Sequence, residues 1–184
     1  MSCKNSEMKM IELHENGLDI QFRIRENGVV ELADFSSQEV KKAVMEPKED
    51  ICYPAVEIHR SGTGSLNMHA YKNNINQSSV DFVYENHELK EQDGGKELEI
   101  VMVSPEKLKA VYHMRLFDGV PAVQTWTEII NEGSEDQGLT YVSSFMYQGI
   151  SRGGEKLIIK KQISMCRLTA GAVRHSGRNT MQKH

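Results

Sequence analysis

Histidines and carboxylates are the side chains in this sequence best suited to acid–base or metal chemistry. The chain holds seven histidines and 26 acidic residues. His59 and His69 lie far apart, and His87 stands directly before Glu88. None of these histidines has the i, i+4 or short-loop spacing of a zinc site, so we expect no metal and no other cofactor. We interpret the histidines as surface or cross-strand residues.

A sugar-directed chemistry is the alternative for His69, His113 and Glu128. A β-sandwich that acts on sugars can pair a histidine with a carboxylate as general acid and base, as sugar mutarotases do. The sequence does not place these three residues relative to one another. A stand-alone carbohydrate-binding or mutarotase-like sandwich therefore remains as a second hypothesis, and a purely structural interaction domain remains as a third.

Other catalytic patterns in the sequence are incomplete. Ser143-Ser144 lacks the GxSxG frame of a nucleophile elbow. Gly62 and Gly64 lack the further glycine and the lysine of a phosphate-binding loop, which favours a plain turn. Most carboxylates fall in expected turns or on polar strand faces, so a solvated surface is favoured over a carboxylate pair for glycoside hydrolysis. We expect no catalytic residue in this chain.

Trp126 is the only tryptophan and the remaining candidate for ligand binding. In a strand its side chain points opposite to those of Val123, Thr125 and Thr127. An aromatic ring at such a place is either a platform for sugar binding or a packing residue. Packing in the core or in an interface is the favoured interpretation.

Period-two alternation of apolar and polar residues dominates the chain and predicts half-buried strands. Asn27-Gly28 and Asp118-Gly119 are hairpin signals because these residue types tolerate the backbone of tight turns. Strands are expected at residues 11–15, 18–24, 29–35, 53–59, 80–84, 98–103, 107–117, 120–131, 139–146 and 156–163, with one helical turn at 38–45. This order predicts a mainly β protein with few helices, an antiparallel sandwich or barrel.

Composition bounds the remaining expectations. The 184 residues, with a net charge of −4, suit one domain and argue against nucleic-acid binding. No apolar run is long enough to cross a bilayer, and the three cysteines form no CxxC pair, so we expect a cytoplasmic protein with free thiols. Residues 1–166 form the expected β domain. Residues 167–184 carry basic but no acidic side chains and are interpreted as an irregular, truncated or non-native tail.

Three segments of the sequence resemble the N-terminal domain of family 36 glycoside hydrolases, the α-galactosidases. The first is Tyr53-Pro54-Ala55-Val56-Glu57-Ile58. The second is residues 98–133, which end in DGVPAVQTWTEIINEG, and the third is Tyr141-Val142-Ser143-Ser144-Phe145. The resemblance covers roughly residues 11–150 and consists of an order of strands and turns.

The resemblance implies a β-supersandwich of the galactose mutarotase type that precedes a catalytic barrel. In the parent enzyme the barrel would hydrolyse terminal α-galactosides with retention, through two carboxylates. The barrel's Lys-Trp-Asp motif is absent here, so no catalytic residue carries over. Asp50, in Glu49-Asp50-Ile51, matches a loop that reaches a neighbouring subunit's active site in some members. We therefore expect a non-catalytic domain or fragment, a homo-oligomer, and Asp50 and Trp126 as candidate sugar-contacting residues.

Overall fold

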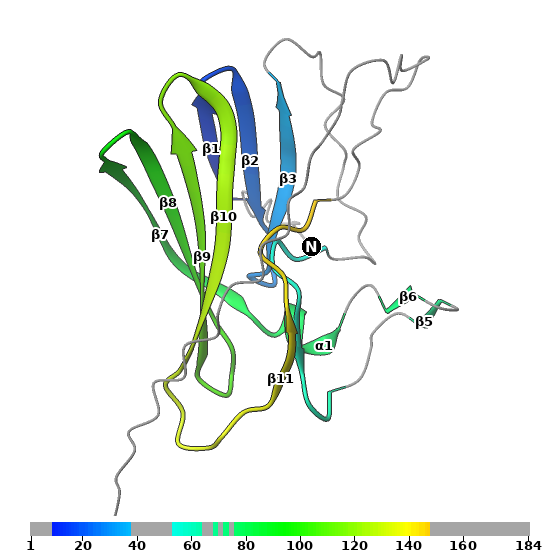
Figure 1. Ribbon diagram of the computed structural model, residues 1–184. Helices are drawn as coiled ribbons and strands as arrows, with labels where there is room; N and C mark the ends of the chain where they lie inside the picture. Colours follow the sequence, from blue (N-terminus) through cyan, green and yellow to red (C-terminus); the bar gives the residue numbers. More distant parts are fainter. Residues whose placement is uncertain (1–8, 38–52, 64–67, 70–71, 74–75, 148–184) are drawn as a thin grey trace, which may run out of the picture.

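The computed structural model describes residues 9–37, 53–63, 68–69, 72–73 and 76–147. Two antiparallel sheets face each other in this part of the chain (Figure 1). The first sheet contains β1 (Lys9–Glu15), β2 (Leu18–Ile24) and β3 (Val30–Ser37), in that order. The second contains β7 (Val83–Gln92), β8 (Gly95–Val103), β9 (Leu108–Phe117) and β10 (Val120–Asn131), in the order β10-β9-β8-β7. The expected antiparallel β-sandwich is therefore confirmed.

The alternating apolar side chains of the two sheets form one core between them. Phe22 of β2 and Tyr112 of β9 are fully buried and meet edge to face, with ring centroids 5.7 Å apart. Burial raises the pKa of the Tyr112 phenol far above its ordinary value, and a hydrogen bond to Thr125 offsets only part of that rise. The second sheet contributes its apolar row of Leu98, Ile100, Met102, Leu108, Ala110, Met114 and Leu116 to this core.

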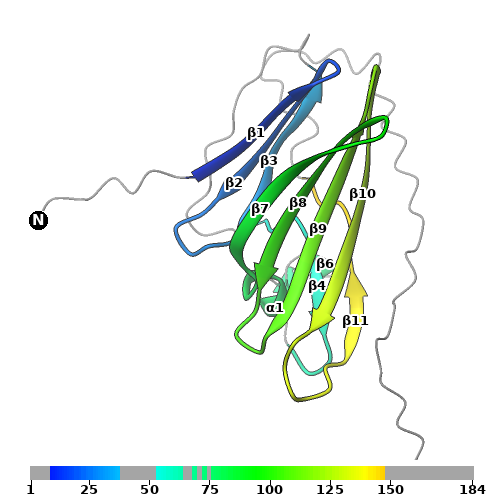
Figure 2. The ribbon, with the colours of Figure 1, turned by 90° about the vertical axis from the view of Figure 1, so that its left-hand side faces the viewer.

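Short elements complete the described part of the chain. β4 (Ile58–Arg60) pairs with β11 (Leu139–Val142), and β5 (Met68–His69) pairs with β6 (Lys72–Asn73). The single helix among the described residues is α1 (Gln77–Val80), which Asn76 caps by accepting a hydrogen bond from the Ser78 backbone N–H. Figure 2 shows the four strands β7 to β10 side by side, with β11 next to the lower part of β10.

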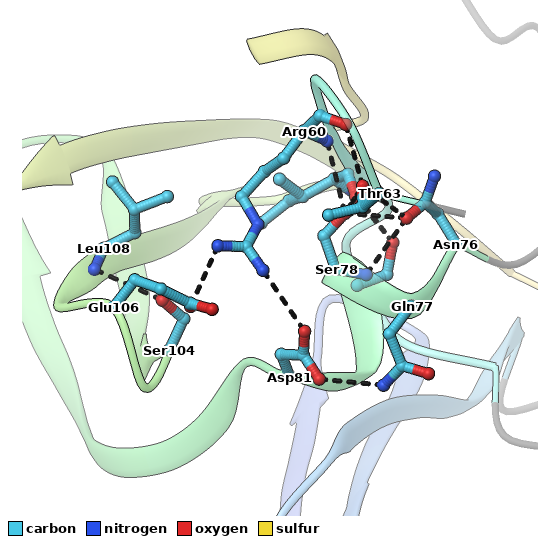
Figure 3. A network of polar contacts seen from close by, with 11 residues as sticks. Arg60, Thr63, Asn76, Gln77, Ser78, Asp81, Ser104, Glu106 and Leu108 are labelled. Atoms are coloured by element: carbon cyan, nitrogen blue, oxygen red, sulfur yellow. Dashed lines mark hydrogen bonds and ion pairs between the residues drawn. The ribbon is translucent and has the colours of Figure 1, made fainter. Parts of the chain in front are cut away.

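A polar network joins β4 to α1 and to the β8–β9 turn (Figure 3). The Arg60 guanidinium lies between Asp81, at 3.3 Å, and Glu106, at 2.9 Å. The Ser78 hydroxyl accepts from the Arg60 backbone N–H at 3.2 Å. Ser79 holds the first residue of β4, because its hydroxyl accepts from Ile58 N–H at 2.9 Å and donates to Ile58 C=O at 3.0 Å. These contacts satisfy the edge of β4 that none of the described strands covers.

Several expected boundaries differ from the structure. Of the strand expected at 53–59, only the last residues are a strand, as the start of β4. Residues 77–80 form α1, where the end of a loop and the first residue of a strand were expected. The strand expected at 80–84 begins at Val83 and extends to Gln92, across a stretch that is polar on both faces. The strand expected at 139–146 ends at Val142. The helical turn at 38–45, the strand at 156–163 and the tail at 167–184 lie outside the described residues.

Among the described residues, no helix has the length and apolar character needed to span a bilayer.

Candidate functional site

Three titratable side chains meet on the face of the second sheet that points away from the core. They are Glu97 and Glu99 of β8 and His113 of β9. All three alternate with core residues along their strands, and the register places Glu99 directly opposite His113. One donor atom from each side chain lies within 4.8 Å of the other two. We refer to these three residues as the outer-face cluster.

The histidine of the outer-face cluster is held between the two carboxylates. His113 Nδ1 lies 2.9 Å from Glu97 Oε1 and 3.8 Å from Glu99 Oε1. The side chains of His113 and Glu97 are 9% and 8% exposed, whereas that of Glu99 is 22% exposed. The cluster is therefore largely shielded from water and opens toward solvent at Glu99.

Neighbouring polar side chains hold the second oxygen of each carboxylate. Gln92 Nε2 donates to Glu97 Oε2 at 2.7 Å, and Lys90 Nζ donates to Glu99 Oε2 at 2.5 Å. The hydrogen bond to Glu99 raises the pKa of the Lys90 ammonium, so this group remains charged at neutral pH. Both Oε1 atoms are thereby left on the side of His113.

Trp126 of β10 covers the other side of the histidine. The Trp126 and His113 rings are stacked, with centroids 4.6 Å apart and an angle of 5° between their planes. Trp126 pairs in register with His113, is partly exposed, and does not belong to the buried core. The core interpretation of Trp126 is therefore wrong. The side chains on its two sides, Thr125 and Thr127, point to the opposite face, where Thr127 donates to the Ser143 carbonyl.

This arrangement supports two kinds of chemistry. A histidine with a carboxylate on one ring nitrogen is the pair used in general acid–base catalysis. Two carboxylate oxygens and an imidazole nitrogen are also a ligand set for a divalent cation. An adjacent aromatic ring adds an apolar surface of the kind that small-molecule sites combine with a few polar groups.

The structure brings together only part of the residues proposed from the sequence. His113 lies in the outer-face cluster, but its carboxylate partners are Glu97 and Glu99, and Glu128 is exposed and pairs in register with Val111. His69 belongs to β5, away from these strands in the sheet order. Asp50 lies outside the described residues. The alternation of β8 already placed Glu97 and Glu99 on the polar face, and the missing information was the register between β8 and β9.

Another histidine–carboxylate pair joins His59 of β4 to Glu57, the residue just before this strand. His59 Nε2 is 2.9 Å from Glu57 Oε1, and its ring lies against that of Tyr141, with centroids 5.1 Å apart. This pair has one carboxylate where the outer-face cluster has two. It is therefore a natural comparison for tests of the cluster.

No protein-family model and no curated protein sequence matches the chain. Solved structures with a similar course of the chain include two of the GH36 alpha-galactosidase AgaA from Geobacillus stearothermophilus. A doubly substituted form in complex with raffinose has a TM-score of 0.43 at 12% identity, over 68% of this chain and 22% of that chain. Another structure of AgaA has a TM-score of 0.42 at 14% identity, over 69% of this chain and 23% of that chain. The chain thus spans less than a quarter of that enzyme's length, and similarity at this level assigns neither a family nor an activity.

Proposed function

We propose that the chain is the non-catalytic N-terminal β-sandwich domain, or a fragment of it, of a cytoplasmic α-galactosidase-like glycoside hydrolase. The parent enzyme would hydrolyse terminal α-galactosides in a separate barrel. The β domain would comprise residues 1–166 and would take part in a homo-oligomer, and Asp50 would approach a sugar site in the assembled enzyme.

The observation that supports this proposal is the meeting of the three sequence segments that resemble such domains. The Ser143 backbone N–H donates to the Glu57 carbonyl at 2.8 Å, and the Ser143 hydroxyl accepts from Glu57 N–H at 2.7 Å. The Ser143 carbonyl accepts from the Thr127 hydroxyl at 3.0 Å. Residues from 53–58, 98–133 and 141–145 therefore form one hydrogen-bonded junction, as expected if the resemblance reflects a structural unit.

The gene itself provides the test. Sequencing beyond the codon for Cys166, in all three frames, should reveal a barrel-coding region with a Lys-Trp-Asp motif. The purified 184-residue chain should not release nitrophenol from p-nitrophenyl α-galactoside. Absence of a barrel-coding region in every frame would overturn the proposal, and so would turnover by the purified chain.

The outer-face cluster favours a second candidate function, a carbohydrate-binding or mutarotase-like site. Trp126 offers a partly exposed ring beside the His113–Glu97 pair, which is the combination that the sugar hypothesis requires. Because Trp126 is the only tryptophan, its fluorescence reports directly on this site. Galactose should change that fluorescence, and mutarotation of galactose should slow to the background rate in His113→Ala. Equal rates in the two proteins and an unchanged emission spectrum would eliminate this candidate.

A further inference from the structure

We propose that the outer-face cluster binds one divalent transition-metal ion, with Glu97, Glu99 and His113 as its protein ligands. The inference does not depend on the function proposed above. It contradicts the expectation from sequence spacing that the chain has no metal site. The spacing rules describe ligands on one helix or one loop, whereas these three ligands come from two neighbouring strands.

The distances between the ligand atoms suit a metal ion. A tetrahedral ion with ligands at about 2.1 Å separates its ligand atoms by about 3.4 Å. The distances from His113 Nδ1 to Glu97 Oε1 and Glu99 Oε1 are 2.9 Å and 3.8 Å, which lie on either side of that value. Two of the three ligand pairs are therefore within about half an ångström of the tetrahedral separation. The oxygens of Glu97 and Glu99 lie within 4.8 Å of each other.

The surroundings orient the carboxylates as a metal site requires. Gln92 and Lys90 each bind the Oε2 atom of one carboxylate and leave both Oε1 atoms beside the imidazole. Hydrogen-bonded carboxylate ligands of this kind are the rule around metal ions. Three protein ligands leave a fourth coordination position for water, on the side where Glu99 is open to solvent.

One ring nitrogen of His113 has no partner of its own. His113 is more than nine-tenths buried, and its Nε2 atom has no hydrogen-bond partner among the described residues. Because the two nitrogens of an imidazole point in different directions, an ion on Nδ1 would not contact Nε2. The ion would be held by Nδ1 and the two carboxylate Oε1 atoms. The imidazole ligand favours zinc and related transition ions over magnesium, which prefers oxygen ligands alone.

Calorimetric titration of the full chain with zinc chloride tests the proposal. Glu99→Gln keeps the side-chain size and removes one ligand charge, so it should abolish one binding equivalent or weaken it by about tenfold or more. The matched control is Glu88→Gln, which removes the same charge from the residue directly opposite Glu99 on β7. Glu88 contacts Lys90 at 3.6 Å but is not part of the cluster, so its isotherm should stay within about twofold of the wild type. Superimposable isotherms for the wild type and Glu99→Gln would overturn the proposal.

A second measurement locates the ion without relying on a variant. The ring nitrogens of His113 are followed by long-range ¹H–¹⁵N NMR while zinc is added to the wild-type chain. The Nδ1 resonance should shift in step with the first equivalent, and an equal amount of magnesium should leave it in place. His59, with its single carboxylate, is the internal comparison. A His113 spectrum that stays unchanged while the chain takes up zinc elsewhere would contradict the assignment.

Discussion

The serine that covers the free edge of β4 allows a stringent test of the packing described above. Ser79 is 1% exposed, and its hydroxyl makes one hydrogen bond to the N–H and one to the C=O of Ile58. The hydroxyl thus takes the place of a neighbouring strand. Ser79→Ala removes both hydrogen bonds and leaves the backbone of the helix and its Asn76 cap unchanged.

The expected loss of stability follows from the burial of the two backbone groups. Ile58 is 1% exposed, so its N–H and C=O cannot be rehydrated without opening the structure. A buried polar group without a partner costs about 1–3 kcal/mol. Allowing for partial entry of water, two such groups predict a loss of about 2–4 kcal/mol in the free energy of unfolding. For a chain of this size that is a fall of roughly 4–16 °C in Tm.

Urea unfolding followed by Trp126 fluorescence and by circular dichroism measures this loss. The midpoint should fall while the m-value stays constant, because the surface exposed on unfolding is unchanged. Ser134→Ala is the control, since Ser134 is exposed in the turn between β10 and β11 and should change stability by about 0.5 kcal/mol or less. If Ser79→Ala is as mild as this control, the account of how α1 completes the β4 edge is refuted.

Further perturbations test the turns, one ion pair and the surface. Gly28→Ala should lower the free energy of unfolding more than Gly17→Ala. Both residues have positive φ, so an alanine at either costs about 1–2 kcal/mol. Only at Gly28 would the new Cβ lie 2.9 Å from Val83 Cβ, a clash that adds about 1–3 kcal/mol. Equal unfolding free energies would exclude that close packing. Partial burial raises the pKa of Glu106, but hydrogen bonds from its own backbone N–H, Ser104 and Arg60, with the Arg60 charge, outweigh it and lower the pKa below 4.5. The wild type should therefore be more stable than Glu106→Gln by its full margin above pH 4.5, and this margin should shrink as the pH falls further. A difference in urea midpoint between the two proteins that does not vary with pH would contradict this. Under the proposed function, the isolated chain would expose apolar surface that the barrel covers in the parent enzyme, so it should self-associate at high concentration. A stable monomer in light scattering would argue against this.

Alternation was sufficient to predict the strands of the core from the sequence. β2, β9 and β10 lie within about one residue of their expected bounds, because each has one apolar and one polar face. β7 was predicted only at its first residues. Residues 85–92 form an exposed edge strand whose side chains are mostly polar on both faces, so the alternation of apolar and polar residues is missing there. α1 has four residues, too few to show a helical period, and only its Asn76 cap marks it.

The candidate site was predicted less completely than the fold. His113 was identified, but its carboxylate partners were not, because a partner across strands depends on register. The β8–β9 turn sets this register: the Lys107 N–H donates to the Ser104 carbonyl, and Lys107 adopts a φ of 62°. Positive φ at a lysine is uncommon and is not visible in the sequence. Trp126 was assigned the correct direction within its strand, but the sequence did not show which face was the core. The core part of its packing interpretation was therefore wrong, and packing in an interface stays a prediction.

The size and activity of the polypeptide that carries this chain test the central claim most directly. An antiserum raised against residues 76–147 is used to immunoprecipitate the protein from extracts of its own cells, and the pellet is assayed with p-nitrophenyl α-galactoside. The account predicts a polypeptide much larger than 184 residues, with α-galactosidase activity in the pellet and a matching loss from the supernatant. A polypeptide of only the size of this chain, with all of the activity left in the supernatant, would contradict it.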